Sequence, residues 1–105
     1  MTANYKKDFE DLVAIVVKEG ASDLHLSEGR QPIIRVVGIL IPLTQYPVYL
    51  HQDIKGILDE LIDDKKKEVF LEKKEVDFAY ENDVAVRLRG NAFYRLSKIS
   101  IALRV

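Results

Sequence analysis

The residues of this chain best suited to chemistry are arginines near its C-terminal end. Two segments of alternating polar and apolar residues, Val84 to Tyr94 and Ile99 to Val105, flank a turn at Leu96-Ser97. If the two segments pair as a hairpin around that turn, Arg89 lies directly opposite Arg104, and Arg87 falls on the same face. Guanidinium groups match phosphate oxygens in shape and keep their charge, so the pattern indicates an anion site.

The two facing arginines have a second interpretation. Like charges directly opposite each other on neighbouring strands repel. The pair becomes favourable when an anion, or a carboxylate such as Glu81 or Asp83, lies between the guanidinium groups. The alternative is an ordinary exposed polar face whose arginines reach nearby carboxylates, and the residues alone slightly favour it.

The other face of the same hairpin is apolar, and this fixes the register. A shift of one residue would mix the two faces, because side chains alternate along a strand. The apolar pairs expected from this register are Leu88 with Val105, Gly90 with Leu103, Ala92 with Ile101 and Tyr94 with Ile99.

The sequence lacks the residues that several other kinds of chemistry require. The five glycines stand at positions 20, 29, 38, 56 and 90, and no Gly-Lys-Ser or Gly-Lys-Thr occurs, so no Walker A phosphate loop is predicted. His25 and His51, without any cysteine, make a poor metal site. His25 is better suited to a hydrogen bond or a contact between domains. We therefore expect no metal site and no enzymatic activity of this chain on its own.

Composition limits the remaining possibilities. With 105 residues, residues 1–105 are expected to form one domain with a modest core. A net charge of −1 gives no general attraction to nucleic acid, and no cysteine is available for disulfides. No apolar run is long enough to span a bilayer, so we expect no direct membrane insertion.

Hydrophobic periodicity predicts the elements that must hold the arginines. Helical spacing predicts helices over 4–19, 51–63 and 63–74, with Gly20 as the cap of the first. Alternation predicts three strands between residues 23 and 43 and three more between Val76 and Val105. The order α-β-β-β-α-α-β-β-β is typical of an α+β fold with a mostly antiparallel sheet of about six strands and helices on one face.

The N-terminal strands also carry a family resemblance. Ala21-Ser22-Asp23-Leu24-His25-Leu26, followed by Ile34-Arg35-Val36-Val37-Gly38, resembles the start of the type IV pilus retraction ATPases, members of the secretion-ATPase superfamily of hexameric motors. The resemblance extends through nearly all of the chain but concerns only the N-terminal domain of those proteins. It implies a PAS-like domain whose C-terminal ATPase domain, with Walker A and B motifs, lies outside this chain.

The resemblance also implies a role for the arginines. In the secretion ATPases the N-terminal domain supplies arginines that approach the triphosphate held by the ATPase domain, one from an Arg-x-Arg-Val-Asn segment and another further along. Here the segment begins Arg87-Leu88-Arg89, and Arg104 follows Arg89 by fifteen residues, as in the family. Arg89 and Arg104, with a weaker contribution from Arg87, are therefore expected to bind nucleotide phosphates together with the ATPase domain.

The function implied is that of a pilus-retraction motor in twitching motility. The resemblance implies a cytoplasmic homohexamer, peripheral to the inner membrane, that uses ATP and Mg²⁺. Its expected partners are the ATPase domains of the same and the neighbouring subunit and a pilus platform protein of the inner membrane. Alone, the chain is expected to be monomeric, to bind neither cofactor and to bind no nucleic acid.

Three departures from the family pattern leave alternatives open. Gly90 stands in place of the usual valine, Val37 in place of a common aspartate, and Arg95-Leu96-Ser97-Lys98 in place of a glycine-containing turn. One alternative is a stand-alone PAS-like sensor or adaptor with an apolar cavity. Another is the equivalent domain of a secretion or pilus-assembly ATPase. We expect the chain to be a piece of a longer protein rather than a natural stand-alone relative.

Overall fold

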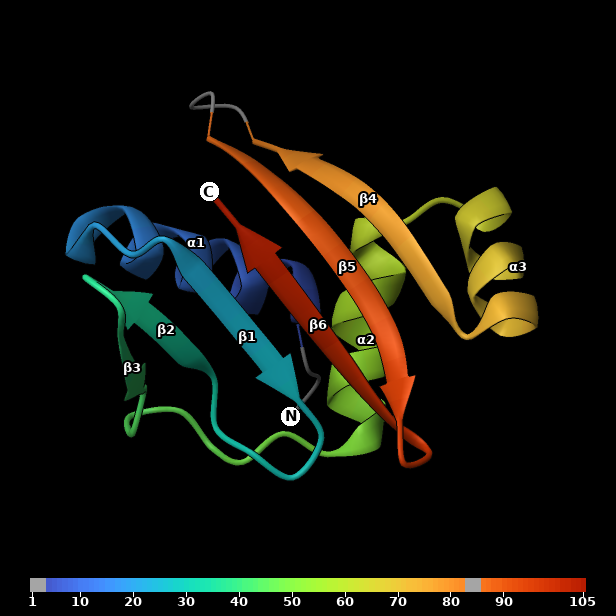
Figure 1. Ribbon diagram of the computed structural model, residues 1–105, viewed down its shortest axis with the longest axis horizontal. Helices are drawn as coiled ribbons and strands as arrows, with labels where there is room; N and C mark the ends of the chain where they lie inside the picture. The colour runs from blue at the N-terminus through green and yellow to red at the C-terminus, as the bar shows by residue number, and fades with distance from the viewer. Residues whose placement is uncertain (1–3, 83–85) are drawn as a thin grey trace.

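Three helices and six strands make up the described part of the chain, residues 4–82 and 86–105 of the computed structural model. They follow one another in the predicted α+β order (Figure 1). The helices are α1 (Tyr5–Glu19), α2 (His51–Leu61) and α3 (Asp64–Lys73). The strands are β1 (Asp23–Ser27), β2 (Ile33–Val36), β3 (Ile39–Pro42), β4 (Glu75–Glu81), β5 (Arg87–Arg95) and β6 (Lys98–Arg104).

The six strands form one antiparallel sheet in the order β3-β2-β1-β6-β5-β4. Each half is a meander of three consecutive strands, and the two halves join where β1 pairs with β6. The first and last strands of the chain therefore lie side by side in the middle of the sheet, with Asp23 opposite Arg104. This pairing brings together residues that are 81 positions apart in the sequence.

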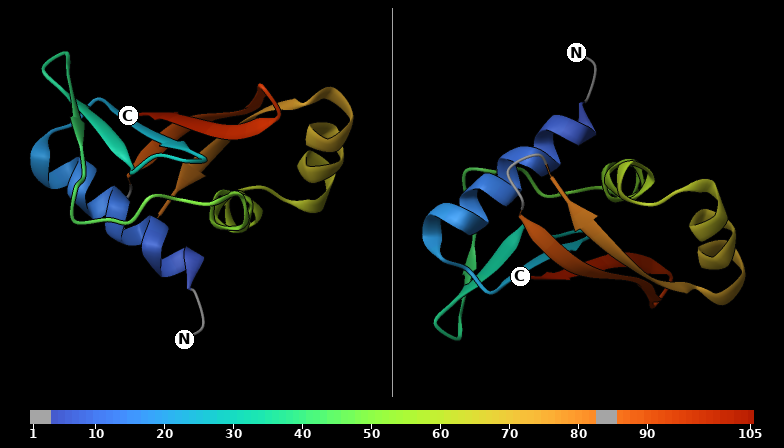
Figure 2. Two further views of the ribbon diagram at one scale, coloured as in Figure 1. Left: turned by 90° about the horizontal axis from the view of Figure 1, so that it is seen from below. Right: turned by 90° about the horizontal axis from the view of Figure 1, so that it is seen from above.

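Helices α1 and α2 cover one face of the sheet, and α3 lies beyond the edge formed by β4 (Figure 2). Helix α1 begins at its cap Asn4, whose side chain accepts a hydrogen bond from the Lys7 N–H at 3.1 Å, and ends at Gly20 with φ 65°. Apolar side chains from both helices and from alternate strand positions fill the space between these layers. The most deeply buried include Leu12, Leu26, Ile54, Ile57, Ala92, Ile99, Ile101 and Leu103.

Glu28 joins three elements at one end of the sheet. Its carboxylate accepts hydrogen bonds from the backbone N–H of Ile99 at 2.6 Å and from His51 Nδ1 at 3.0 Å. Burial alone would raise the pKa of Glu28. The Ile99 N–H and the His51 ring favour the charged carboxylate more strongly, so the pKa of Glu28 is lowered.

The predicted register of the β5–β6 hairpin is confirmed, with Arg89 opposite Arg104, Ala92 opposite Ile101 and Arg95 opposite Lys98. The turn is made by Leu96 (φ 52°) and Ser97 (φ 65°), although neither is glycine. The left-handed region costs a residue with a Cβ about 1–2 kcal/mol. The strong alternation of the two strands therefore sets the register despite unfavourable turn residues.

Two details of the predicted hairpin are different in the structure. Val105 lies beyond β6 and is 65% exposed, so it does not extend the apolar face beside Leu88. Its backbone N–H instead donates to the Ser22 carbonyl at 3.0 Å. The strand expected from Val84 begins at Arg87, and Val84 itself is outside the described residues.

Two glycines within these elements lie against aromatic rings. A Cβ on Gly56 of α2 would overlap the Tyr5 ring, and a Cβ on Gly90 of β5 would overlap the Phe78 ring of the neighbouring strand. The Phe78 ring thus occupies the space that the valine usual at this position would need. This packing explains one of the three departures from the family pattern.

We predict that Gly90→Val lowers the free energy of unfolding by about 1–3 kcal/mol, because the added side chain must displace the buried Phe78 ring. Chemical denaturation of the purified chain measures the change. Ala79→Val, which adds bulk on the exposed side of β4, is expected to change it by less than about 0.5 kcal/mol. In a Phe78→Leu background Gly90→Val should cost clearly less, and an equal cost in both backgrounds would contradict this packing argument.

Candidate functional site

The face of the sheet opposite α1 and α2 is not covered by any helix of the described residues (Figure 1). The strand register places one row of residues across it from β3 to β4. This row, in spatial order, is Leu40, Arg35, Asp23, Arg104, Arg89 and Ala79. The predicted facing pair, Arg89 and Arg104, is therefore brought together on an open surface. Arg87 lies on the same face, two residues from Arg89 along β5.

Asp23 is the one buried residue with a polar or charged side chain in the described ranges. Its carboxylate accepts from the Ser22 hydroxyl at 2.7 Å and from Arg104 Nε at 3.4 Å, and it lies 3.5 Å from Arg35 Nε. Burial alone would raise the pKa of Asp23. The Ser22 hydroxyl and the Arg104 guanidinium outweigh burial, so the pKa of Asp23 is lowered and the group stays charged.

Arg89 has a different environment from Arg104. Both side chains are exposed, but only Arg104 has a carboxylate partner, since no ion pair of Arg89 is present within the described residues. Glu81, one of the two carboxylates suggested for the space between the arginines, instead pairs with Arg87 at 3.6 Å. Asp83, the other carboxylate suggested, is outside the described residues. Arg89 thus has an adjacent like charge and, in the part of the chain that the structure describes, no carboxylate paired with it.

The arginine pair borders a shallow depression of about 630 Å³ in the uncovered face. Lys66 and Asn91 add hydrogen-bond donors to its lining, whereas Asp23 and Asp77 add negative charge. Asn91 Nδ2 already donates to Asp77 Oδ1 at 2.7 Å. This mixture of charges means that the lining of the depression is not uniformly positive.

Neither a metal-binding cluster nor a membrane-spanning helix is found in the described residues. Within residues 4–82 and 86–105, no group of three or more histidine, cysteine or carboxylate side chains is arranged to hold a metal ion. Of the helices in these ranges, none combines the length and the apolar character needed to cross a bilayer.

Asp23 and Arg35 are functional candidates that sequence reasoning did not identify. Asp23 belongs to the N-terminal segment that carries the family resemblance, but its partner Arg104 lies at the other end of the chain. The pairing of β1 with β6 brings them together, and no local pattern specifies it. Asp23 alternates with His25 and Ser27 at the polar positions of β1, so nothing in the local pattern sets it apart.

Known proteins with similar sequences include two pilus ATPases. The chain is 38% identical over 86 residues to the type IV pilus retraction ATPase PilT of Pseudomonas aeruginosa, covering 82% of this chain and 25% of that protein. It is 34% identical over 98 residues to the uncharacterized protein YggR of Escherichia coli, covering 93% of this chain and 29% of that protein. It is 30% identical over 97 residues to the type IV pilus ATPase PilU of P. aeruginosa, covering 92% of this chain and 25% of that protein. The chain thus spans about a quarter of the length of these relatives, and no family model matches it.

Solved structures of similar fold include the pilus retraction motor PilT with bound ADP. It superposes with a TM-score of 0.83 at 27% identity, covering 90% of this chain and 28% of that chain. The ATPase DotB of Legionella pneumophila superposes with a TM-score of 0.86 at 21% identity, covering all of this chain and 30% of that one. At that identity the likeness to DotB shows the fold alone.

We predict opposite effects of neutralising the two facing arginines on stability. Arg89→Gln should raise the free energy of unfolding by about 0.2–1 kcal/mol, because it removes a like-charge contact. Arg104→Gln should lower it by about 1 kcal/mol, because the buried Asp23 carboxylate loses a charged donor. Denaturation of both variants at low salt provides the measurement, and a decrease in both, or an equal change in both, would contradict the assigned environments.

We also predict a loss of stability in acid that depends on Asp23. Its folded pKa is lowered, so its contribution is complete above the unfolded value of about 4 and disappears as the pH falls through the lower folded value. Glu28 adds a loss of the same sign. Unfolding free energies measured from about pH 7 down to about pH 2 should fall less steeply for Asp23→Asn than for the unchanged chain.

The control for this titration is Asp59→Asn, which removes an exposed carboxylate 3.6 Å from Lys55 on the surface of α2. An exposed pair of this kind contributes little, so the acid-side slope should stay that of the unchanged chain. An Asp23→Asn curve parallel to the Asp59→Asn curve would show that Asp23 is not the source of the acid sensitivity.

Proposed function

We propose that this chain, a homologue of the type IV pilus ATPases PilT and PilU, is the N-terminal domain of a pilus-retraction motor ATPase. In this proposal residues 1–105 form one domain that is joined to an ATPase domain and moves against it as a rigid lever. The chain itself contains no Gly-Lys-Ser or Gly-Lys-Thr, so the phosphate-binding loop would belong to the partner domain.

The observation that carries the proposal is the pairing of Arg89 with Arg104 on the uncovered face of the sheet. Two guanidinium groups side by side weaken an isolated sheet, and only Arg104 is balanced by Asp23. A phosphate group placed between them would turn the repulsion into two charge-assisted hydrogen bonds. The mixed charge of the adjacent depression supports a site completed by another domain rather than one that works in the isolated chain.

ATP, with its Mg²⁺, supplies the phosphoryl group that the ATPase domain transfers to water. Arg89 and Arg104 would hold phosphate oxygens from the side of this domain and stabilise the charge of the transferring group. Because these contacts strengthen with phosphate charge, they would favour a closed arrangement of the two domains before hydrolysis and a more open one afterwards. Arg87, already paired with Glu81, would contribute only to the surrounding positive field.

The homology supports further proposals about the whole protein. We place it in the cytoplasm as a homohexamer, peripheral to the inner membrane, with a platform protein of the pilus as its membrane partner. Retraction is preferred over assembly or secretion because PilT, at 38% identity, is named for retraction, whereas the likeness to DotB concerns the fold alone. The uncovered sheet face is available for the ATPase domain, which also favours the motor over a stand-alone sensor.

We predict that Arg89→Ala and Arg104→Ala, made in the intact protein, each lower ATP turnover at least about tenfold, since arginines that act on a transferring phosphate contribute several orders of magnitude. Arg87→Ala should cause a smaller loss because its side chain is held by Glu81. Steady-state phosphate release, with hexamer formation followed by light scattering, measures both activity and assembly.

The control is Lys65→Ala, which removes an exposed positive charge from α3, outside both depressions lined by the sheet face. Turnover should then be unchanged. Normal turnover and assembly in both Arg89→Ala and Arg104→Ala would remove the basis for the proposed role.

A further inference from the structure

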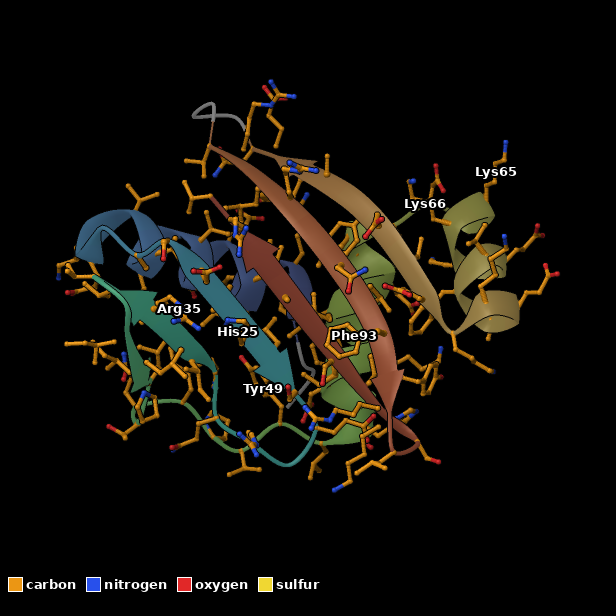
Figure 3. All side chains as sticks on the ribbon, viewed as in Figure 1. His25, Arg35, Tyr49, Lys65, Lys66 and Phe93 are labelled. Carbon is orange, nitrogen blue, oxygen red and sulfur yellow. The ribbon has the colours of Figure 1, made fainter. Side chains whose placement is uncertain are left out.

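A second depression, of about 250 Å³, lies on the same face of the sheet. It adjoins the first at His25 and Ala102, which line both. Three arginines surround it, and they come from separate segments: Arg30 from the turn after β1, Arg35 from β2 and Arg95 from the end of β5. Figure 3 shows Arg35, His25 and Phe93 on this face, on strands β2, β1 and β5.

The two depressions differ in charge. The first contains Asp23 and Asp77, whereas no carboxylate side chain is among the residues that line the second. This is a local feature, because the chain as a whole has 17 acidic and 16 basic residues. Close positive charges without a counter-ion repel one another, and a bound anion relieves that repulsion.

The arginines of the second depression are not equally available. Arg35 is engaged, since its Nε lies 3.5 Å from Asp23 and its terminal nitrogen donates to the Gly38 carbonyl at 3.4 Å. Arg30 and Arg95 are exposed and take part in no ion pair within residues 4–82 and 86–105. These two guanidinium groups therefore have free donors to offer to a ligand.

The rest of the lining suits a phosphorylated ligand. The hydroxyls of Ser27 and Ser100 are 3.0 Å apart, and since one donates to the other, one hydroxyl hydrogen stays free to point at a ligand. The half-buried ring of Phe93 forms part of the wall and offers an apolar surface beside the charged groups. Paired guanidinium forks with an extra hydroxyl donor match the oxygens of a diphosphate.

We propose that this depression is a second anion site, in which Arg30 and Arg95 bind the diphosphate group of a small molecule. It is separate from the pair formed by Arg89 and Arg104, and it works in the chain without an ATPase domain. The diphosphate belongs either to inorganic pyrophosphate or to a nucleotide whose base packs on Phe93. The first depression, with its two carboxylates, should bind diphosphate far more weakly in this chain.

The test is a titration of the isotopically labelled chain with inorganic pyrophosphate, followed by amide NMR. We expect saturable shifts centred on Arg30, Arg95 and Ser100, weakened by added salt. The double variant Arg30→Gln, Arg95→Gln should bind at least about tenfold more weakly while keeping a dispersed, folded spectrum. Lys65→Gln with Lys73→Gln is the matched control, because it removes two exposed positive charges from α3, outside both depressions, and it should bind as the unchanged chain does.

A parallel titration with ADP distinguishes the two sources of diphosphate. Tighter binding of ADP than of pyrophosphate, with the gain lost in Phe93→Leu, supports a nucleotide, and equal affinities support the diphosphate alone. Absence of saturation, shifts centred on Arg89 and Arg104, or full binding by the Arg30→Gln, Arg95→Gln variant would each overturn the proposal. None of these results bears on ATP turnover in the intact protein, so the two proposals fail separately.

Discussion

A single buried carboxylate determines how positive charge is distributed over the uncovered face of the sheet. Asp23 lies in a central strand between Arg35 and Arg104, and the pairing of the first and last strands holds it there. Its charge is maintained against burial by the Ser22 hydroxyl and the Arg104 guanidinium. Because one carboxylate cannot also reach Arg89, the β5–β6 register leaves that arginine as the uncompensated member of the pair. On this face, Asp23 balances the charge of Arg35 and Arg104, whereas the charge of Arg89 is not balanced by any described carboxylate.

The unpaired charge of Arg89 is the feature of the fold that bears on the homology with pilus ATPases. Within the described residues the helices cover one face of the sheet only, and Arg89 lies on the other face without an ion pair, which is the basis of the proposed contact with a second domain that brings an anion. The same surface also contains two kinds of environment: a mixed-charge depression beside Arg89 and Arg104, and one beside Arg30 and Arg95 whose only lining groups of fixed charge are arginines. In the first, Asp23 and Asp77 oppose the charge of the arginines, whereas no carboxylate lines the second.

Local features of this chain could be predicted from the sequence, and contacts distant in sequence could not. The alternation of residues around Leu96-Ser97 specified the hairpin register and so the facing arginines, even though both turn residues have positive φ. The ion pair of Asp23 with Arg104 depends on two meanders meeting at their first and last strands, which no local pattern encodes. Glu81 pairs with Arg87 rather than lying between Arg89 and Arg104, because the β4–β5 register, which was not predicted, places it opposite Arg87. Gly90 in place of valine was noted as a departure, but its cause, the Phe78 ring on the adjacent strand, is also a contact across the sheet.

Joint binding of phosphate by Arg89 and Arg104, as proposed, would be seen most directly in a structure of the intact protein with a non-hydrolysable ATP analogue. We expect guanidinium nitrogens of both arginines within about 2.7–3.2 Å of phosphate oxygens, with the sheet face closed onto the ATPase domain. A structure in which the ATPase domain alone contacts the phosphates, with Arg89 in solvent and Arg104 still paired only with Asp23, would contradict it.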